Sequence, residues 1–384
     1  MSRTSTALVS ALLAAAAVVP AAAAPAAAAT PDRAGGRTAL QQSLDAVVAA
    51  GVPGAIAEVR DEHGTWRGSS GIADIGSGRH AQAGDKFRAG SVTKSFVATV
   101  VLQLVAEHKL GLDDAIEQHL PGLVPNGEHI TVRQLLAHTS GLADYLTDVL
   151  MKRENAVRDL QTATYTPRDL VAIAAEPGPK FAPGTSWSYS NTNYVVLGLL
   201  IEKTTGHSLG QEIGRRIVRP LHLTGTSFPT TPKMPGAHLN GYEWFNGPSA
   251  APTDTTEFSL SVYWGAGTLI STTHDLNTFY RALGKGTLLP PALQHEMYTM
   301  RPDGADRPGR SYGLGLEGSV NYCAGSGQAP VWGHTGSVAG YNTFSFTTAD
   351  GKRQVTLSLN QNISKTEKQD QAAIKVLSTA LCRK

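Results

Sequence analysis

The stretch Ala89-Gly90-Ser91-Val92-Thr93-Lys94 opens a strongly apolar helical segment and decides which fold the chain adopts. Apolar residues recur at helical spacing as far as His108, which predicts a largely buried helix beginning near Ser91. Ser91 and Lys94 are three residues apart, so their side chains share one face of that helix. A lysine in a first turn opposes the helix dipole. Helping to deprotonate Ser91 is a chemical reason for placing it there.

Each feature of this stretch also has a purely structural interpretation. A serine before a helix is often only an N-cap, and Lys94 could be a solvated first-turn lysine. About one Ser-x-x-Lys match is expected by accident in a chain of this composition, so the pattern is weak on its own. The information lies in two further polar segments that follow it in order.

The second segment is Tyr189-Ser190-Asn191, in a polar and aromatic stretch. We expect Tyr189 to be a proton shuttle, because a phenol near protonated Lys94 would ionise more easily and could pass the Ser91 proton to a leaving group. Asn191 would position the substrate amide. The alternative is a turn in which Asn191 caps the next helix.

The third segment is His334-Thr335-Gly336-Ser337, expected at the end of one strand and the start of the turn to the next. The strand edge would align the substrate backbone, and the Ser337 amide would join the Ser91 amide as an oxyanion hole. Hydroxyls of Thr335 or Ser337 could bind a substrate carboxylate. We expect His334 to weaken that binding as its imidazolium is lost at about pH 6–7. The alternative is a core or edge histidine satisfied by its neighbours.

The order of helical and strand patterns predicts the architecture. Helices are expected over 38–50, most of 112–219, 275–283 and 368–381, and strands over 54–59, 66–72, 312–320, 331–334, 340–347 and 353–360. This order favours an α+β fold, an antiparallel sheet flanked by the N- and C-terminal helices with an inserted, mostly helical domain. We assign 38–90 and 260–384 to the sheet domain and 91–259 to the helical domain.

Composition and the first residues bound the function classes. The chain has 384 residues and a net charge of +2, which is too near neutral to favour nucleic acid or a membrane surface as partner. Residues 1–29 combine Arg3 with an apolar stretch and small-residue sites ending near Ala24 or Ala29, as is typical of a secretory signal peptide. No later stretch approaches the roughly 18 apolar residues of a spanning helix. We therefore expect a secreted protein without a membrane anchor.

The two cysteines, Cys323 and Cys382, predict one disulfide in an exported protein. It would close a loop of 382 − 323 = 59 residues. Two buried free thiols are the alternative. The twelve histidines lack the spacing of a metal site, so we expect neither metal nor cofactor. The segment 206–210 matches a nucleophile-elbow pattern that needs a preceding strand, whereas here Gly206 is expected to end a helix and Ser208 to cap the next one.

Five segments together resemble the serine penicillin-recognising superfamily, closest to its branch of secreted D-alanyl-D-alanine carboxypeptidases and class C β-lactamases. The segments are Ser91-Val92-Thr93-Lys94, Leu135-Leu136-Ala137-His138-Thr139-Ser140-Gly141, Tyr189-Ser190-Asn191, Leu200-Ile201-Glu202-Lys203-Thr204-Thr205-Gly206 and His334-Thr335-Gly336. The resemblance runs from about residue 38 to residue 382. It implies an acyl-enzyme on Ser91, no metal, a substrate with a D-configured residue, and acylation by penicillin.

The resemblance thus implies a D-alanyl-D-alanine carboxypeptidase acting on peptidoglycan peptides, with β-lactams as inhibitors or substrates, and we expect a monomer. One departure concerns the residue after Tyr312-Gly313-Leu314-Gly315-Leu316, where carboxypeptidases of this branch carry a basic residue for the terminal carboxylate. This chain has Glu317, which would repel a carboxylate if it faced the cleft. An esterase, a β-lactamase or a D-aminopeptidase is therefore the alternative. A non-catalytic β-lactam sensor is a different class, disfavoured by the expected lack of a membrane segment.

Overall fold

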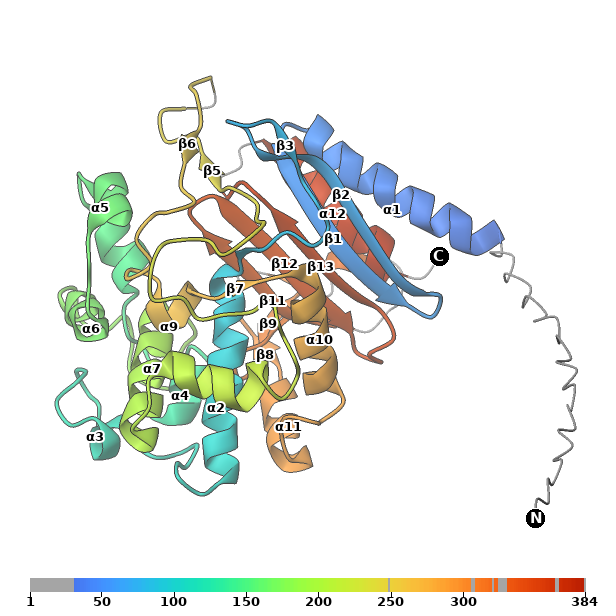
Figure 1. The fold of residues 1–384 in the computed structure, drawn as a ribbon. Helices are drawn as coiled ribbons and strands as arrows, with labels where there is room; N and C mark the ends of the chain where they lie inside the picture. The colour runs from blue at the N-terminus through green and yellow to red at the C-terminus, as the bar shows by residue number, and fades with distance from the viewer. Residues whose placement is uncertain are drawn as a thin grey trace, which may run out of the picture.

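The computed structural model describes residues 31–247, 249–304, 308–319, 321–323, 330–362 and 366–382. The predicted signal peptide, residues 1–29, lies outside these ranges. Within them, nine strands form one antiparallel sheet in the order β3-β2-β1-β13-β12-β11-β10-β9-β8 (Figure 1). These strands are β1 (Gly54–Asp61), β2 (Gly64–Asp74), β3 (Arg79–His80), β8 (Arg301–Pro302), β9 (Arg310–Tyr312), β10 (Glu317–Ser319), β11 (Val331–Val338), β12 (Tyr341–Thr348) and β13 (Gln354–Leu359).

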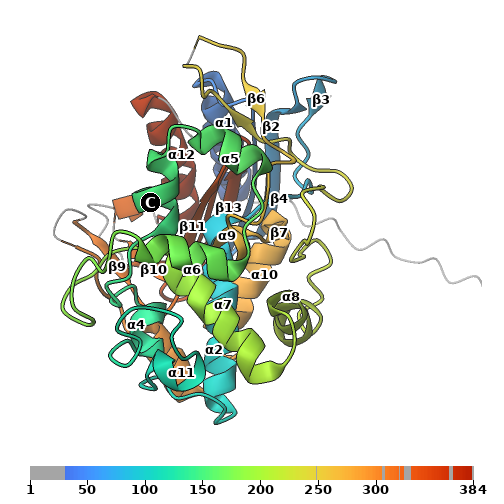
Figure 2. The same cartoon turned by 90° about the vertical axis from the view of Figure 1, so that its left-hand side faces the viewer.

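Helices cover both faces of this sheet. The terminal helices α1 and α12 pack together on one face, and α10 and α2 pack on the other face (Figures 1 and 2). The α-helices are α1 (Pro31–Ala49), α2 (Thr93–Ala106), α3 (Ile116–His119), α4 (Val132–Leu136), α5 (Ala156–Thr162), α6 (Pro167–Ala175), α7 (Asn191–Thr205), α8 (Leu209–Ile213), α9 (Trp264–Gly267), α10 (Thr273–Gly284), α11 (Pro291–Tyr298) and α12 (Glu367–Leu381). None of the helices described here is both long and apolar enough to cross a membrane.

The predicted α+β fold is confirmed, because the sheet takes its strands from both ends of the chain. β1 pairs with β2 and with β13, so that Ala55 lies opposite both Ser70 and Leu359. Two short strand pairs lie outside the main sheet, β4 (Phe87–Arg88) with β7 (Ile270–Ser271) and β5 (Tyr242–Glu243) with β6 (Thr253–Asp254).

The helix α2 runs through the middle of the molecule. Its residues from Thr93 to Leu102 are all buried, which agrees with the apolar pattern that predicted a buried helix. Each fully buried valine, leucine or phenylalanine contributes about 1.5–3 kcal/mol relative to an exposed one. The first turn of α2 is therefore held rigidly between the sheet and the surrounding helices.

Two strand boundaries differ from the sequence prediction. The predicted strand 312–320 is two short strands, β9 and β10, which pair antiparallel around a turn. Gly315 in that turn has φ +80°, and an added Cβ would lie 2.3 Å from the Ala98 side chain, so the turn presses against α2. β11 continues to Val338 instead of ending at His334, because it pairs with β12 along its whole length.

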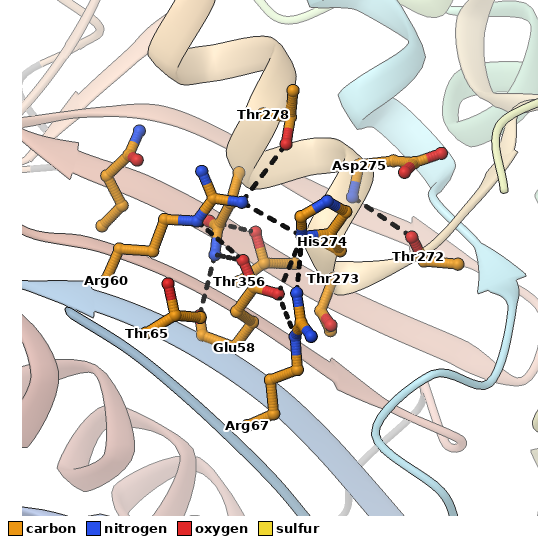
Figure 3. A network of polar contacts seen from close by, with 12 residues as sticks. Glu58, Arg60, Thr65, Arg67, Thr272, Thr273, His274, Asp275, Thr278 and Thr356 are labelled. Carbon is orange, nitrogen blue, oxygen red and sulfur yellow. Dashed lines mark hydrogen bonds and ion pairs between the residues drawn. The ribbon is translucent and has the colours of Figure 1, made fainter. Parts of the chain in front are cut away.

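A charge network around the buried carboxylate of Glu58 fastens α10 to the sheet. Figure 3 shows Arg60 and Arg67 turned toward Glu58, and their Nε atoms lie 2.9 and 2.7 Å from its carboxylate oxygens. Both guanidinium groups also lie close to Nδ1 of His274 in the first turn of α10, at 3.0 and 2.8 Å. Asn277 donates to the Glu58 carbonyl oxygen at 3.0 Å. A buried carboxylate without such partners would cost several kcal/mol, so the network holds β1, β2 and α10 in one arrangement.

The predicted disulfide between Cys323 and Cys382 is confirmed. Their Cα atoms lie 5.4 Å apart, and the bond joins the turn after β10 to the end of α12. The disulfide thereby fastens α12 to the chain that follows β10, the strand that pairs with β11.

Candidate active site

Ser91 lies in a single 3-10 turn, Gly90–Val92, directly before α2. Neither the turn nor α2 has a side-chain hydrogen bond at its N-cap, so Ser91 is not a helix cap. Thr93 closes the turn by donating from Oγ1 to the Gly90 carbonyl oxygen at 2.7 Å. Gly90 has φ +55°, and an added Cβ would lie 2.6 Å from the Ser337 backbone nitrogen. The turn therefore packs backbone to backbone against β11.

Lys94 is fully buried beside the serine hydroxyl. Its Nζ lies 2.9 Å from Ser91 Oγ, 2.8 Å from Asn191 Oδ1 and 2.7 Å from the Ala266 carbonyl oxygen. Burial lowers the pKa of Lys94 from 10.5 to about 7, against the attraction of two nearby carboxylates. A lysine that is partly neutral near pH 7 can accept the proton of Ser91. The predicted Ser91–Lys94 pair is thus brought together in a form suited to activate the serine.

Asn191 is the first residue of α7 and uses both ends of its amide within the protein. Its Oδ1 accepts from Lys94, and its Nδ2 donates to Asp144 Oδ2 at 2.8 Å. Asp144 is buried, and burial raises the pKa of its carboxyl group. The contact of Asn191 with a substrate amide stays a prediction. Asp144 is a site residue that the sequence analysis missed.

The turn that carries Asp144 is joined to the start of α7 by buried polar contacts. His138 has φ +60°, and its Nδ1 lies 3.2 Å from the Ser190 backbone nitrogen and 3.0 Å from Asn193 Nδ2. Ser140 donates to Asn193 Oδ1 at 2.6 Å. The available signal in the sequence was a single aspartate among apolar residues at 142–146, because a charge in such a run needs buried partners.

Tyr189 packs beside Lys94, whose Nζ lies 4.9 Å from the centre of the phenol ring. Burial raises the pKa of the Tyr189 phenol well above its usual value of 10, and the nearby Ser91 side chain offsets only part of this rise. The expectation of an easily ionised phenol is therefore wrong, because desolvation outweighs the nearby cation. Tyr189 can still relay a proton as a neutral phenol, and Lys94 is better suited to be the base.

His334 lies in β11 and is completely buried. Its Nε2 is 2.9 Å from the Tyr312 hydroxyl, and its Nδ1 is 2.5 Å from the Thr335 carbonyl oxygen. Burial lowers the pKa of this imidazole from 6.5, although Glu317 opposes the change. This placement favours the alternative of a core histidine satisfied by its neighbours. Direct binding of a substrate carboxylate by His334 finds no support in the geometry.

Glu317 in β10 lies against the strand that carries Thr335. Thr335 donates from Oγ1 to Glu317 Oε1 at 2.8 Å and from its backbone nitrogen to Oε2 at 3.3 Å. Arg310 donates to the same Oε2 at 3.0 Å, and its Nε lies 3.8 Å from Asp303. The Thr335 hydroxyl that was predicted to hold a substrate carboxylate is thus already bound to a carboxylate of the protein.

The backbone at Gly336 and Ser337 lies directly against the serine turn. An added Cβ at Gly336 would lie 2.0 Å from the Ala89 carbonyl oxygen and 3.3 Å from the Ser91 nitrogen, so only glycine fits. The Ser337 hydroxyl contacts the side chain of Asn362. This close approach brings the Ser91 and Ser337 amides to one place. An oxyanion hole requires such a pair of donors, and its formation here stays a prediction.

The structure therefore gathers a hydroxyl, a poised amine, a phenol and two backbone segments around one point. These are the parts of an acyl-transfer site, namely a nucleophile, a base, a proton relay and donors for a developing oxyanion. In the part of the chain that is described, no three or more His, Cys, Asp or Glu side chains gather as a metal would require.

Comparison with known proteins agrees with this chemistry. The model of a family described as Beta-lactamase matches residues 37–379. A D-stereospecific amidohydrolase from a Streptomyces species has a structure with a TM-score of 0.78 and 38% identity, covering 88% of this chain and 98% of that one. A D-amino acid amidase from Ochrobactrum anthropi SV3, solved with L-phenylalanine amide, has a TM-score of 0.80 and 27% identity, covering 90% and 98%.

Curated relatives include penicillin-binding proteins. Penicillin-binding protein 4* of Bacillus subtilis is 26% identical over 319 residues, which are 80% of this chain and 67% of that protein. The chain spans less of two other curated relatives, 53% of PbpX of Bacillus subtilis and 34% of protein flp of Staphylococcus aureus. The rest of each of those two proteins lies outside the match.

Proposed function

The chain belongs to the Beta-lactamase family of serine hydrolases, and we propose that it is a D-stereospecific amidohydrolase working through an acyl-enzyme on Ser91. The observation that carries this proposal is the Glu317 carboxylate bound to Thr335. A leaving group that ends in a carboxylate would add a negative charge beside Glu317 and Asp303, which share the guanidinium of Arg310. A neutral amide or ester adds none. The likeness to a D-stereospecific amidohydrolase and a D-amino acid amidase supports the same choice.

The proposed reaction proceeds in two proton-coupled steps. Neutral Lys94 accepts the Ser91 proton while Oγ bonds to the substrate carbonyl carbon, and the amides of Ser91 and Ser337 bind the resulting oxyanion. The carbon–nitrogen bond then breaks, and the proton returns to the leaving amine through Tyr189. Water then attacks the ester in the same way. Its oxygen bonds to the acyl carbon while Lys94 accepts one of its protons. The bond between the acyl carbon and Ser91 Oγ breaks, and that proton passes to Oγ.

A comparison of four substrates tests the leaving-group preference. These are D-phenylalanine amide, its L enantiomer, a peptide ending in D-Ala-D-Ala, and the same peptide amidated at its C-terminus. Like charges in contact cost several kcal/mol, so we expect kcat/KM for the amidated peptide to exceed that for the free acid by at least about tenfold. In the Glu317→Gln variant, which lacks this negative charge, we expect a smaller ratio of kcat/KM for the amidated peptide to kcat/KM for the free acid. Equal turnover of acid and amide by the unmodified enzyme would contradict the proposal.

Labelling with a fluorescent penicillin tests the nucleophile. We expect a covalently labelled band for the unmodified chain and none for Ser91→Ala. Ser208→Ala is a matched control, because Ser208 belongs to the nucleophile-elbow pattern but caps α8. Persistent labelling of Ser91→Ala would remove Ser91 from the mechanism.

A D-alanyl-D-alanine carboxypeptidase remains the second candidate, favoured by the similarity to Penicillin-binding protein 4* and by the guanidinium of Arg310 near the strand edge. It predicts the opposite order for the peptide pair, with the free acid turned over faster than the amide. An esterase or a β-lactamase on the same scaffold would instead prefer a simple ester or a β-lactam. Adding a simple ester and a β-lactam to the four substrates therefore separates these activities.

Export of the protein is a further part of the proposal. It rests on residues 1–29, which have the composition of a secretory signal peptide. We expect N-terminal sequencing of the protein from culture medium to begin after Ala24 or Ala29. Recovery of the full-length chain only from the cell interior would contradict it.

A further inference from the structure

We propose that Asp144 is a positioning residue for acylation, which fixes the orientation of the Asn191 amide and thereby aims the lone pair of neutral Lys94 at Ser91. This inference rests on the proposed roles of Ser91 and Lys94. Asp144 contacts neither Ser91 nor Lys94 by hydrogen bond and acts through Asn191.

The first step of the argument concerns the direction of the Asn191 amide. A carboxylate only accepts hydrogen bonds, so the Asn191 group facing Asp144 Oδ2 at 2.8 Å must be its NH₂. The other carboxylate oxygen accepts from the Leu146 amide at 2.9 Å, which prevents Asp144 from turning away. The amide oxygen of Asn191 is consequently directed at Lys94.

The second step concerns the hydrogens of Lys94. Its Nζ has three neighbours within 2.9 Å, and two of them, Asn191 Oδ1 and the Ala266 carbonyl oxygen, have no hydrogen to give. A neutral amine has two N–H groups and one lone pair. The two N–H groups bind those oxygens, and the lone pair is left facing the Ser91 hydroxyl, which carries the proton to be removed. If the Asn191 amide turned over, its NH₂ would compete with Ser91 for that lone pair.

Burial makes this arrangement depend on Asp144. Lys94 is 0% exposed, Asp144 is 2% and Asn191 is 9%. Water therefore has little access to replace Asp144 as the acceptor for the Asn191 NH₂ group. An amide at position 144 could instead donate to Asn191 and stabilise the reversed orientation.

Charge gives a second, independent readout. Burial lowers the pKa of Lys94 to about 7, and the Asp144 carboxylate opposes that change. Removing the carboxylate lowers the pKa further, so the acid limb of the rate profile moves to lower pH. The other ionisable groups around Lys94 keep their contributions; they are Glu317, His334, Tyr189 and Tyr194. The position of the limb therefore reports that the Asp144 charge reaches Lys94, and the rate on the plateau above the limb reports the positioning of Asn191.

The experiment uses the full chain and the Asp144→Asn variant, which preserves the size of the side chain. Acylation by fluorescent penicillin and hydrolysis of D-phenylalanine amide are followed from pH 5 to 9, with a thermal melt for each protein. We expect kcat and the acylation rate to fall about 10²-fold, as for a misplaced catalytic group, with KM changed less than about threefold and an acid limb at lower pH. Asp148→Asn is the matched control. Asp148 accepts from the Asp144 backbone nitrogen at 2.9 Å and pairs with Lys180, and we expect unmodified kinetics.

A double variant provides a rescue. Asp144→Asn combined with Asn191→Asp exchanges the two groups, so that position 191 again presents an acceptor to Lys94 and position 144 a donor to position 191. Because the exchanged carboxylate contacts Lys94 and raises its pKa, recovery is measured at the alkaline end of the pH range, where we expect at least a tenfold gain over Asp144→Asn. The proposal is overturned if folded Asp144→Asn acylates within threefold of the unmodified chain at pH 9. Should that variant not fold, the proposal is overturned if the folded double variant is not faster than about a hundredth of the unmodified rate at pH 9. If Ser91→Ala keeps its labelling, the proposed function itself has failed, whatever Asp144 does.

Discussion

Replacing Gly336 with alanine tests how closely β11 must approach the serine turn. The added Cβ would lie 2.0 Å from the Ala89 carbonyl oxygen, whereas ordinary contact begins at 3.4 Å. The two backbones would therefore have to separate by up to 3.4 − 2.0 = 1.4 Å. No side-chain rotation can relieve the clash, because the opposing atom belongs to the backbone. A displacement of about 1 Å around reacting atoms costs on the order of 10²-fold in rate.

We expect Gly336→Ala to be acylated by fluorescent penicillin about 100-fold more slowly than the unmodified chain, with a similar loss of kcat on D-phenylalanine amide. Overpacking of this kind costs about 1–3 kcal/mol, so the variant stays folded at 25 °C and melts at a lower temperature. Gly84→Ala is the matched control, because a Cβ at Gly84 meets no atom within 4 Å. A folded Gly336→Ala variant that acylates within threefold of the unmodified rate would refute the requirement for this close approach.

Three further outcomes follow from the geometry. Burial lowers the pKa of Lys94 to about 7, so the neutral fraction of Lys94 increases from roughly a tenth at pH 6 to nine tenths at pH 8. We expect the acylation rate to rise about tenfold between these two pH values and then to level off. A continued rise beyond pH 9 would contradict this expectation. Tyr189→Phe removes the hydroxyl near Ser91. We expect the acylation rate to fall about 10²-fold or more, with the acid limb of the rate profile unmoved. A moved limb would assign that limb to the phenol. Reducing the Cys323–Cys382 bond, which spans 59 residues, should lower the free energy of unfolding by about 4 kcal/mol. Equal midpoints of urea unfolding with and without reductant would contradict a stabilising effect of this bond.

Features that depend on nearby residues could be predicted from the sequence. Ser91 and Lys94 meet because residues three apart lie on one helix face, and the structure places them 2.9 Å apart. The decoy pattern at 206–210 was also interpreted correctly. Gly206 ends α7 with φ +71°, and Ser208 caps α8 with a reciprocal bond to Gln211.

Features set by distant residues could not be predicted in the same way. Asp144 accepts a hydrogen bond from Asn191, 47 residues further along the chain, and no local pattern predicts that contact. The sequence predicts a lowered pKa for the Tyr189 phenol, whereas burial raises it. That burial is decided by the surrounding fold and not by neighbouring residues in the chain. The length of β11 depends on its pairing with β12, and the turn at Gly315 depends on the surface of α2.

The pairing of β1 with β13 has a consequence for how the protein is made. The Gly54 backbone nitrogen donates to the side chain of Asn360, a partner 306 residues away. Ser91 is synthesised well before β11, which packs against the serine turn, and before β13, which joins β1 to the rest of the sheet. We therefore expect the nascent polypeptide to lack hydrolytic activity until β13 has been synthesised. A prematurely terminated product that stopped before β13 would leave β1 and β12 with open edges, which invite association with other chains.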